Sequence, residues 1–221
     1  MKKKIVIFDL DGTLINTLED LKNSTNYALS CLNYPTKTID EICQFVGNGV
    51  AKLIERAIPD GKDNPDFQQC LETFKNHYSK NMYNKTAPYN KIPQMLKTLK
   101  QKGYITAVVS NKFDMAVKEL CSKYFPDLID FAAGENEACG IRKKPAPDTV
   151  LKVLEKFNLT NNEAVYVGDS DVDIMTAKNS RMPCISVTWG FRNREFLTKH
   201  DAEIIIDSPD EIIDILENRL K

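Results

Sequence analysis

Three short runs of apolar residues, each ending abruptly in polar residues, constrain this chain more than any other feature. The runs occupy residues 5–8, 105–109 and 164–167. Apolar residues on consecutive positions are typical of strands buried on both faces of a parallel sheet. The carboxyl ends of such strands meet at one edge of the sheet, where open α/β folds bind their ligands. We therefore expect the three polar clusters to lie close together.

Helical patterns separate the expected strands. Val150, Leu154 and Phe157 recur at spacings of three and four, and weaker strands are expected at 184–188 and 203–206. The last helix is expected to begin at Pro209, with Ser208 as its cap and Glu211 completing a capping box. This alternation predicts an α/β fold with a doubly wound, Rossmann-like parallel sheet as its core.

Residues 15–82 interrupt the alternation, because they carry helical patterns without a convincing strand. The apolar positions with helical spacing are Leu14, Leu18, Leu21, Ala28 and Leu32, then Phe67, Leu71, Phe74, Tyr78 and Met82. We predict a small helical cap domain, residues 15–82, inserted after the first strand of a catalytic core made of residues 1–14 and 83–221. Segments 15–17 and 83–89 would form the two connections of a hinge.

Two carboxylates one residue apart, Asp9 and Asp11, follow the first expected strand, and Gly12 and Thr13 come next. A turn in which the aspartates bond their own backbone is the alternative interpretation. That interpretation does not explain why polar clusters also follow the other two strands. The pair is therefore a candidate for chemistry.

Asp169, Asp171 and Asp173 form an acidic cluster after the third expected strand. Beside Asp9 they would offer the oxygen ligands that Mg²⁺ prefers. Alternating aspartates also occur in EF-hand calcium loops, but Ile174 occupies the position where such a loop requires Gly. Alternatively, some of these aspartates cap a helix that begins near residue 171, with Asp171 as the candidate.

A basic run at residues 142–144 ends in Lys144, immediately before Pro145 and an expected helix start. The rigid proline restrains Lys144, so one cation could be held there to balance carboxylates and an anionic substrate. Arg142 and Lys143 are interpreted as solvated surface residues.

The composition excludes some classes of function. Lys and Arg number 30 against 31 Asp and Glu, for a formal net charge of −1, so nucleic acid is not an expected partner. No apolar run is long enough to span a bilayer, and Asp9 ends the first run too early for a signal peptide. The cysteines include no Cys-x-x-Cys pair and are interpreted as thiols in a reducing cytosol. We expect a cytoplasmic monomer or homodimer. The six cysteines are Cys31, Cys43, Cys70, Cys121, Cys139 and Cys184.

Four segments in order resemble the motifs of the haloacid dehalogenase superfamily of phosphohydrolases, over nearly the whole chain. They are Phe-Asp-Leu-Asp-Gly-Thr-Leu at 8–14, Ser-Asn at 110–111, Lys-Pro at 144–145 and Gly-Asp-Ser-Asp-Val-Asp at 168–173. The insert, with Phe-Val-Gly-Asn-Gly at 45–49, and Val-Thr-Trp-Gly-Phe at 187–191 are similar to the phosphoglycolate phosphatase subgroup. Asn16 departs from that subgroup, in which an aspartate is common, so its local contact can differ.

The resemblance implies a Mg²⁺-dependent phosphomonoesterase. Asp9 would attack phosphorus to form an aspartyl phosphate, and Asp11 would protonate the leaving oxygen and later deprotonate water. Mg²⁺ would be held by the Asp9 carboxylate, the Asp11 carbonyl and Asp169, and Lys144 would share in charge neutralisation. Asp173 would support the shell around the metal.

Further residues would bind the substrate. Ser110, Asn111, Thr13 and nearby backbone amides would hold the phosphoryl oxygens. Gly47, Asn48 and Gly49 interrupt a helical pattern and are the candidate substrate loop, although a plain helix–helix turn fits them equally well. The candidate loop residues are Gly47, Asn48 and Gly49.

A small phosphorylated metabolite is the expected partner, with phosphoglycolate as the leading substrate and a nucleoside monophosphate or pyrophosphate close behind. A phosphomutase is an alternative, although the insert lacks an obvious cationic cluster for a second phosphate. A non-catalytic phospho-ligand binding module is another, which the intact Asp9, Asp11, Lys144 and Asp169 argue against. A dehalogenase fits least, because it needs neither an acid like Asp11 nor an acidic metal cluster.

Overall fold

The computed structural model describes residues 2–136 and 140–220, in two compact units. Residues 1–15 and 88–221 form one unit, here called the sheet unit, and residues 16–87 form the other, called the helical unit. The chain passes between them through β2 (Ile15–Asn16) and β3 (Ala87–Pro88), which pair as a two-stranded sheet. Within the described ranges, no helix has both the length and the apolar character needed to cross a bilayer.

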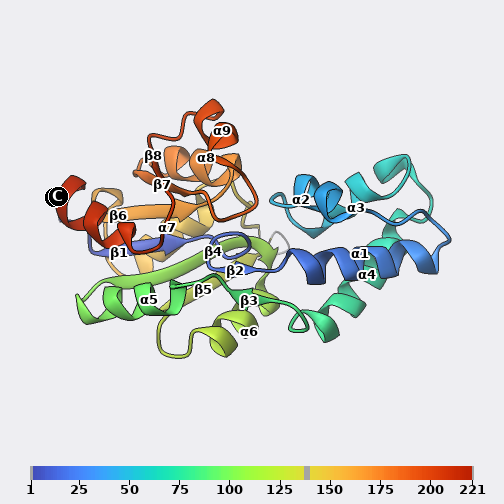
Figure 1. Ribbon diagram of the computed structural model, residues 1–221, viewed down its shortest axis with the longest axis horizontal. Helices are drawn as coiled ribbons and strands as arrows, with labels where there is room; N and C mark the ends of the chain where they lie inside the picture. The colour runs from blue at the N-terminus through green and yellow to red at the C-terminus, as the bar shows by residue number, and fades with distance from the viewer. Residues whose placement is uncertain (1, 137–139, 221) are drawn as a thin grey trace. The chain divides into compact units, whose positions relative to one another are not determined.

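The sheet unit contains a six-stranded sheet in the order β5-β4-β1-β6-β7-β8 (Figure 1). All neighbouring pairs are parallel. This confirms the predicted α/β fold. The strands are β1 (Ile5–Phe8), β4 (Ile105–Phe113), β5 (Phe131–Glu135), β6 (Ala164–Gly168), β7 (Cys184–Val187) and β8 (Ile204–Ile206).

The register of the three central strands brings their carboxyl ends to the same level. Phe8 at the end of β1 is opposite Val108 of β4 and Val167 of β6. Every residue of β1 and β6 is buried, as the continuous apolar runs predicted, because helices cover both faces of the sheet. The strand order reverses between β1 and β6, the position where open α/β sheets form a ligand crevice.

Within residues 2–15, 88–136 and 140–220, six α-helices of the sheet unit connect and cover the strands. Val150 and Val153 of α7 pack on the face that presents Ile5 and Ile7, and α5 covers the opposite face (Figure 1). The helices are α5 (Ile92–Gln101), α6 (Asp114–Tyr124), α7 (Asp148–Lys156), α8 (Asp171–Asn179), α9 (Arg194–Lys199) and α10 (Glu211–Asp214), which continues as one π-helical turn, Ile215–Arg219.

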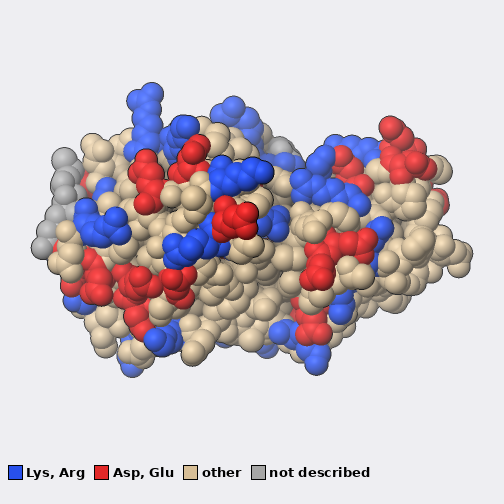
Figure 2. Space-filling model, turned by 45° about the horizontal axis from the view of Figure 1, so that its top comes forward, with Lys and Arg blue, Asp and Glu red and all other residues tan. Residues whose placement is uncertain are grey.

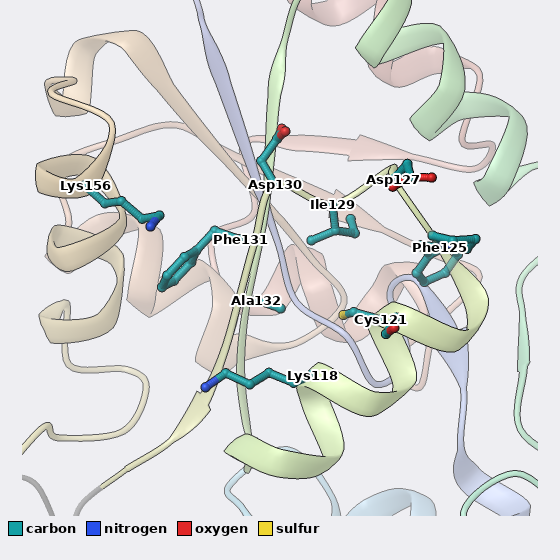
Figure 3. Close-up of a pocket in the computed structure, with 11 residues that line it drawn as sticks. Lys118, Cys121, Phe125, Asp127, Ile129, Asp130, Phe131, Ala132 and Lys156 are labelled. Atoms are coloured by element: carbon teal, nitrogen blue, oxygen red, sulfur yellow. The ribbon is translucent and has the colours of Figure 1, made fainter.

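Strand β5 forms one edge of the sheet, and a hollow of about 490 Å³ lies beside it (Figure 3). Lys118 of α6 and Lys156 of α7 flank this strand, and the Lys156 ammonium lies 5.4 Å from the centre of the Phe131 ring. Lysines beside an edge strand disfavour pairing with a strand of another chain. The hollow contains none of the residues singled out as candidates for chemistry, and we assign it no ligand.

The helical unit consists of α1 (Leu18–Cys31), α2 (Ile39–Phe45), α3 (Val50–Ala57), a 3₁₀ turn (Gly61–Asp63) and α4 (Phe67–Asn81). Its α2 begins with a capping box, because Thr38 and Glu41 each accept a hydrogen bond from the other's backbone N–H. Leu29 of α1 and Phe74 of α4 are buried in this unit. The helical insertion after β1 was predicted and is confirmed.

A buried carboxylate in the helical unit anchors the returning chain. Asp20 of α1 accepts hydrogen bonds from the backbone N–H of Lys85, at 2.9 Å, and from both the N–H and the hydroxyl of Thr86, at 2.9 and 2.8 Å. These donors replace the water that the carboxylate loses on burial. The segment predicted as a return linker is therefore tied to the first helix of the unit.

Several local expectations were wrong in detail. Ser170, and not Asp171, caps α8, since its hydroxyl accepts the N–H of Asp173. The helix α10 begins at Glu211 instead of Pro209, although Glu211 does accept the N–H of Ser208, at 2.9 Å. Helix α7 begins at Asp148, four residues after Lys144. Strand β4 continues with an irregular register through the polar segment 110–112, which was expected to follow it.

Charges on the surface are mixed in sign. Figure 2 shows basic and acidic side chains interspersed on the face that it presents. The cysteines within the described residues, five in number, are all free thiols, and Cys139 lies outside those residues.

Candidate active site

Three buried aspartates meet where β1 and β6 end. Asp9 follows β1, Asp169 follows β6, and Asp173 lies in the first turn of α8. Each offers a carboxylate oxygen, and these three oxygens lie within 4.8 Å of one another. The predicted convergence of the strand-end clusters is therefore present for Asp9 and Asp169.

Lys144 provides positive charge inside this cluster. Its Nζ lies 2.9 Å from Asp9 Oδ1 and 2.8 Å from Asp173 Oδ1, and it donates to the Tyr166 hydroxyl at 3.0 Å. The Asn111 amide donates to the Lys144 carbonyl at 3.0 Å and so holds its backbone in place. Arg142, in contrast, is exposed and pairs with Asp148.

Burial makes the carboxylates of this cluster hard to ionise together. It raises the pKa of Asp9 to about 7, with Lys144 opposing the change and Asp173 adding to it. It also raises the pKa of Asp169 to about 8, and the negative charges of Asp173 and Asp9 add to the effect. For Lys144 burial alone would lower the pKa, but Asp173 and Asp9 outweigh it and raise the pKa well above its usual value. Three acidic side chains with oxygens within 4.8 Å of one another, two of them paired with one ammonium group, fit a divalent cation with oxygen ligands.

Asp173 and Asp169 differ in how their oxygens are used. One oxygen of Asp173 pairs with Lys144, and the other accepts the N–H and hydroxyl of Ser170, at 3.1 and 2.6 Å. Asp169 accepts the Thr13 hydroxyl at 3.1 Å and the Phe191 N–H at 2.7 Å. Both carboxylates thus use both oxygens, but Asp173 is paired with the Lys144 ammonium group whereas the Thr13 hydroxyl and the Phe191 N–H are neutral donors to Asp169. The ion pair favours a supporting position for Asp173.

The turn after β1 depends on Gly12. This residue has φ of +85°, and a Cβ placed on it would lie 2.5 Å from Asp169 Oδ2. Any other residue would be strained there and would displace the carboxylate. Thr13 is buried, and its hydroxyl proton is donated to Asp169; its expected contact with a phosphoryl group stays a prediction.

Asp11 pairs with Lys112, a residue for which the sequence pattern predicts no role. Lys112 Nζ lies 3.0 and 3.1 Å from the two carboxylate oxygens of Asp11. The lysine side chain is 2% exposed and that of Asp11 19%. The Lys112 N–H also donates to the Ser110 hydroxyl at 3.2 Å. Its position directly after Ser110 and Asn111 was the only signal in the sequence.

Two aromatic residues also reach the site without having been assigned to it. The Tyr166 hydroxyl donates to the Val109 carbonyl at 3.0 Å and accepts from Lys144, so this apolar-run residue orients the lysine. The Trp189 indole donates to the Thr13 carbonyl at 3.0 Å. In the sequence, the segment containing Trp189 indicates only a resemblance to a family pattern.

The candidate substrate loop belongs to the helical unit. Gly47, Asn48 and Gly49 connect α2 to α3, and both glycines have positive φ, at +112° and +86°. A turn between two helices is therefore present. Contact of this loop with a substrate stays a prediction.

A family model described as haloacid dehalogenase-like hydrolase matches residues 6–187 of the chain. The chain belongs to this family. Membership confirms the resemblance seen in the four sequence segments, and the helical insertion after β1 corresponds to the family's cap. The carboxylates of the site, Lys144 and Ser110 lie in the segments that carried that resemblance.

Named relatives of this haloacid dehalogenase-like hydrolase match it over nearly its full length. A phosphoglycolate phosphatase of Aquifex aeolicus is 32% identical, over 98% of both chains. One from Mannheimia succiniciproducens is 33% identical, over 94% of this chain and 96% of the relative. A crystal structure of a predicted phosphoglycolate phosphatase from Haemophilus somnus has a TM-score of 0.89 at 29% identity and covers 97% of this chain and 98% of its own.

Proposed function

We propose that this protein is a Mg²⁺-dependent phosphomonoesterase that forms an aspartyl phosphate on Asp9 and acts on a small phosphorylated metabolite. The observation that carries the proposal is the meeting of Asp9, Lys144 and Asp169 at the ends of adjacent strands, with Asp11 one residue beyond Asp9. This arrangement combines a nucleophile, a fixed cation and acidic oxygens in one site.

In the first step, a carboxylate oxygen of Asp9 attacks phosphorus, and the bond from phosphorus to the ester oxygen breaks. Asp11, in its protonated form, donates its proton to that oxygen, so the alcohol departs and Asp11 becomes a carboxylate. Lys144 keeps Asp9 oriented through the 2.9 Å ion pair. Ser110 and Asn111 are proposed to hold the phosphoryl oxygens.

In the second step, the Asp11 carboxylate removes a proton from water, and the water oxygen attacks phosphorus. The bond from phosphorus to Asp9 breaks, inorganic phosphate leaves, and Asp11 again carries the proton needed for the next cycle. The same residue thus acts first as an acid and then as a base.

Mg²⁺ would be held by the Asp9 carboxylate, the Asp11 carbonyl and Asp169, with Asp173 supporting that shell. When bound, it supplies positive charge that favours the ionised form of Asp9 and offsets the charge of the phosphoryl group. Thr13 and the Phe191 N–H orient Asp169 for this role through their hydrogen bonds.

Phosphoglycolate is the proposed substrate, because relatives that match nearly the full chain at about one-third identity are named phosphoglycolate phosphatase. We propose that Gly47, Asn48 and Gly49 contact the part of the substrate that is not phosphate. Specificity would then depend on the helical unit, while the sheet unit provides the chemistry.

A screen of phosphate esters with released phosphate as the readout tests the function. We expect turnover of phosphoglycolate that stops in excess chelator and returns with Mg²⁺, with slower turnover of a nucleoside monophosphate, pyrophosphate and 4-nitrophenyl phosphate. Preference for another ester would replace the substrate and keep the reaction class. Hydrolysis of none of them, or full activity in chelator, would contradict the proposed reaction.

The role of the α2–α3 turn is tested separately with Asn48→Ala. Loss of a polar contact to the leaving group should lower kcat/KM for phosphoglycolate by about 10-fold or more, and the rate on 4-nitrophenyl phosphate much less. An equal change for both esters would show that the turn is structural.

A further inference from the structure

Lys112 holds Asp11 by a contact that the local sequence does not suggest. The two residues are 101 positions apart, and the register of β4 beside β1 brings them together. The lysine Nζ is nearly equidistant from the two oxygens of Asp11, at 3.0 and 3.1 Å. A cation that contacts both oxygens restricts rotation of the carboxyl group.

The environment of this pair is asymmetric. The Lys112 side chain is almost fully enclosed, whereas Asp11 retains some exposure. An enclosed lysine has few conformations open to it, so its ammonium group provides a fixed contact for the carboxyl group of Asp11. The Lys112 N–H at the same time contacts the Ser110 hydroxyl, so one residue contacts two side chains of the proposed machinery.

We propose that Lys112 is a positioning residue that fixes the carboxyl group of Asp11 for proton transfer, an inference that rests on the proposed function. Lys112 acts through Asp11 and makes no contact with the phosphoryl group itself. Its loss leaves Asp9, Lys144 and Asp169 unchanged but lets the Asp11 carboxyl group rotate away from the leaving oxygen.

Dependence on the leaving group distinguishes this role from direct binding of phosphate. An alkyl phosphate such as phosphoglycolate releases a weakly acidic alcohol that needs a proton, whereas 4-nitrophenolate leaves readily without one. We expect Lys112→Met to lower kcat/KM for phosphoglycolate by about 100-fold, within the range of general acid catalysis, and that for 4-nitrophenyl phosphate by less than about 10-fold. Equal losses on both esters would overturn the proposal.

A double-mutant cycle tests whether the effect passes through Asp11. In the Asp11→Asn background, Lys112→Met should cause no further loss of kcat/KM, because no acid remains to be positioned. A full additional loss would assign Lys112 to direct substrate contact instead. Lys3→Met is the matched control, since Lys3 is also buried but precedes β1, where it donates to the Asn162 carbonyl; its turnover should match wild type.

Thermal unfolding of wild type, Lys112→Met, Asp11→Asn and the double variant provides a measurement that does not depend on activity. The decrease in melting temperature of the double variant should be smaller than the sum of the decreases of the single variants. Additive decreases would show that Lys112 and Asp11 do not interact in solution. If Lys112→Met does not fold, Lys112→Gln is assayed in its place under the same criteria. If wild type hydrolyses no ester, the proposed function fails, while coupled unfolding would still show that Lys112 holds Asp11.

Discussion

Both units of this protein bury a carboxylate, but they satisfy it in opposite ways. In the helical unit, Asp20 is surrounded by N–H and hydroxyl donors of Lys85 and Thr86. In the sheet unit, Asp9 faces two other carboxylates and one ammonium group. The first arrangement replaces water with neutral dipoles, and the second assembles charges that oppose one another.

The difference indicates what each unit contributes. Neutral N–H and hydroxyl donors bind a carboxylate without charge repulsion, so Asp20 stabilises the folded helical unit. Burial raises the pKa of Asp9 to about 7 and that of Asp169 to about 8, and repulsion from Asp173 adds to both, while Lys144 opposes the rise at Asp9. A bound cation can relieve an arrangement of carboxylates that is unfavourable in the protein alone.

The largest expected effect comes from Asp9→Asn. Because an amide is a poor nucleophile, turnover should fall by about 10⁴-fold or more. The melting temperature should stay the same or rise, since the change removes one of three mutually repelling charges. Asp20→Asn is the matched control for loss of a buried carboxylate. Turnover near the wild-type rate by Asp9→Asn would mean that another group or water attacks phosphorus.

Lys144→Ala should combine a loss of activity with a loss of stability. Removal of the ammonium group leaves carboxylates unneutralised, so kcat should fall by about 10²–10³-fold and the free energy of unfolding by about 3 kcal/mol. Lys143→Ala is the control from the adjacent, less buried position. Urea denaturation and phosphate release measure the two effects. Equal behaviour of the two variants would contradict the distinction between these lysines.

Asp20→Asn should show the reverse pattern from Asp9→Asn. The amide cannot accept all the hydrogen bonds from Lys85 and Thr86, so the free energy of unfolding should fall by about 1–3 kcal/mol. Turnover at saturating substrate should stay within about threefold of wild type. Urea denaturation and a kcat measurement test both parts, and a stable but inactive variant would place Asp20 with the catalytic carboxylates.

The smallest effect concerns a carboxylate at the opposite end of the sheet from the site. Lys4 and the cap of Thr160 lower the pKa of Glu163 from 4.5 to about 2. As pH falls, Glu163 is therefore protonated in the unfolded chain before it is protonated in the folded chain. The stabilisation is present above pH 4.5 and is lost as pH falls from 4.5 to 2. Glu163→Gln should flatten this part of the curve of unfolding free energy against pH. An unchanged curve between pH 4.5 and 2 would show that the contacts of Glu163 with Lys4 and Thr160 add nothing to stability.

Local patterns were sufficient for the sheet and for the first members of the site. The apolar runs before Asp9 and Asp169 reflect burial on both faces, a property that each strand carries in its own residues. The details at helix ends were not predictable in the same way, as Ser170 and Asp171 show. Both are good capping residues, and the backbone conformation that the preceding strand allows selects between them.

Two contacts show why the remainder of the site could not be read from the sequence. The Tyr166 hydroxyl binds Lys144 because β6 and the segment before α7 meet in the core, and its position within an apolar run suggested only packing. The Trp189 indole binds the Thr13 carbonyl from a loop 176 residues away. Neither partner is recognisable by residue type, since tyrosine, tryptophan and carbonyl groups occur throughout the chain.

The strands, the helical insertion and the carboxylates that follow β1 and β6 could be predicted from residue pattern, because periodicity and strand-end polarity are properties of neighbouring residues. Which charges face one another depends on how the chain folds in three dimensions. Lys112 meets Asp11 beside the register of β4 and β1, across 101 positions of sequence, and Lys144 meets Asp9 and Asp173 from the segment before α7. Charge pairing acts over a few ångströms in space and leaves no spacing along the chain by which it could be recognised.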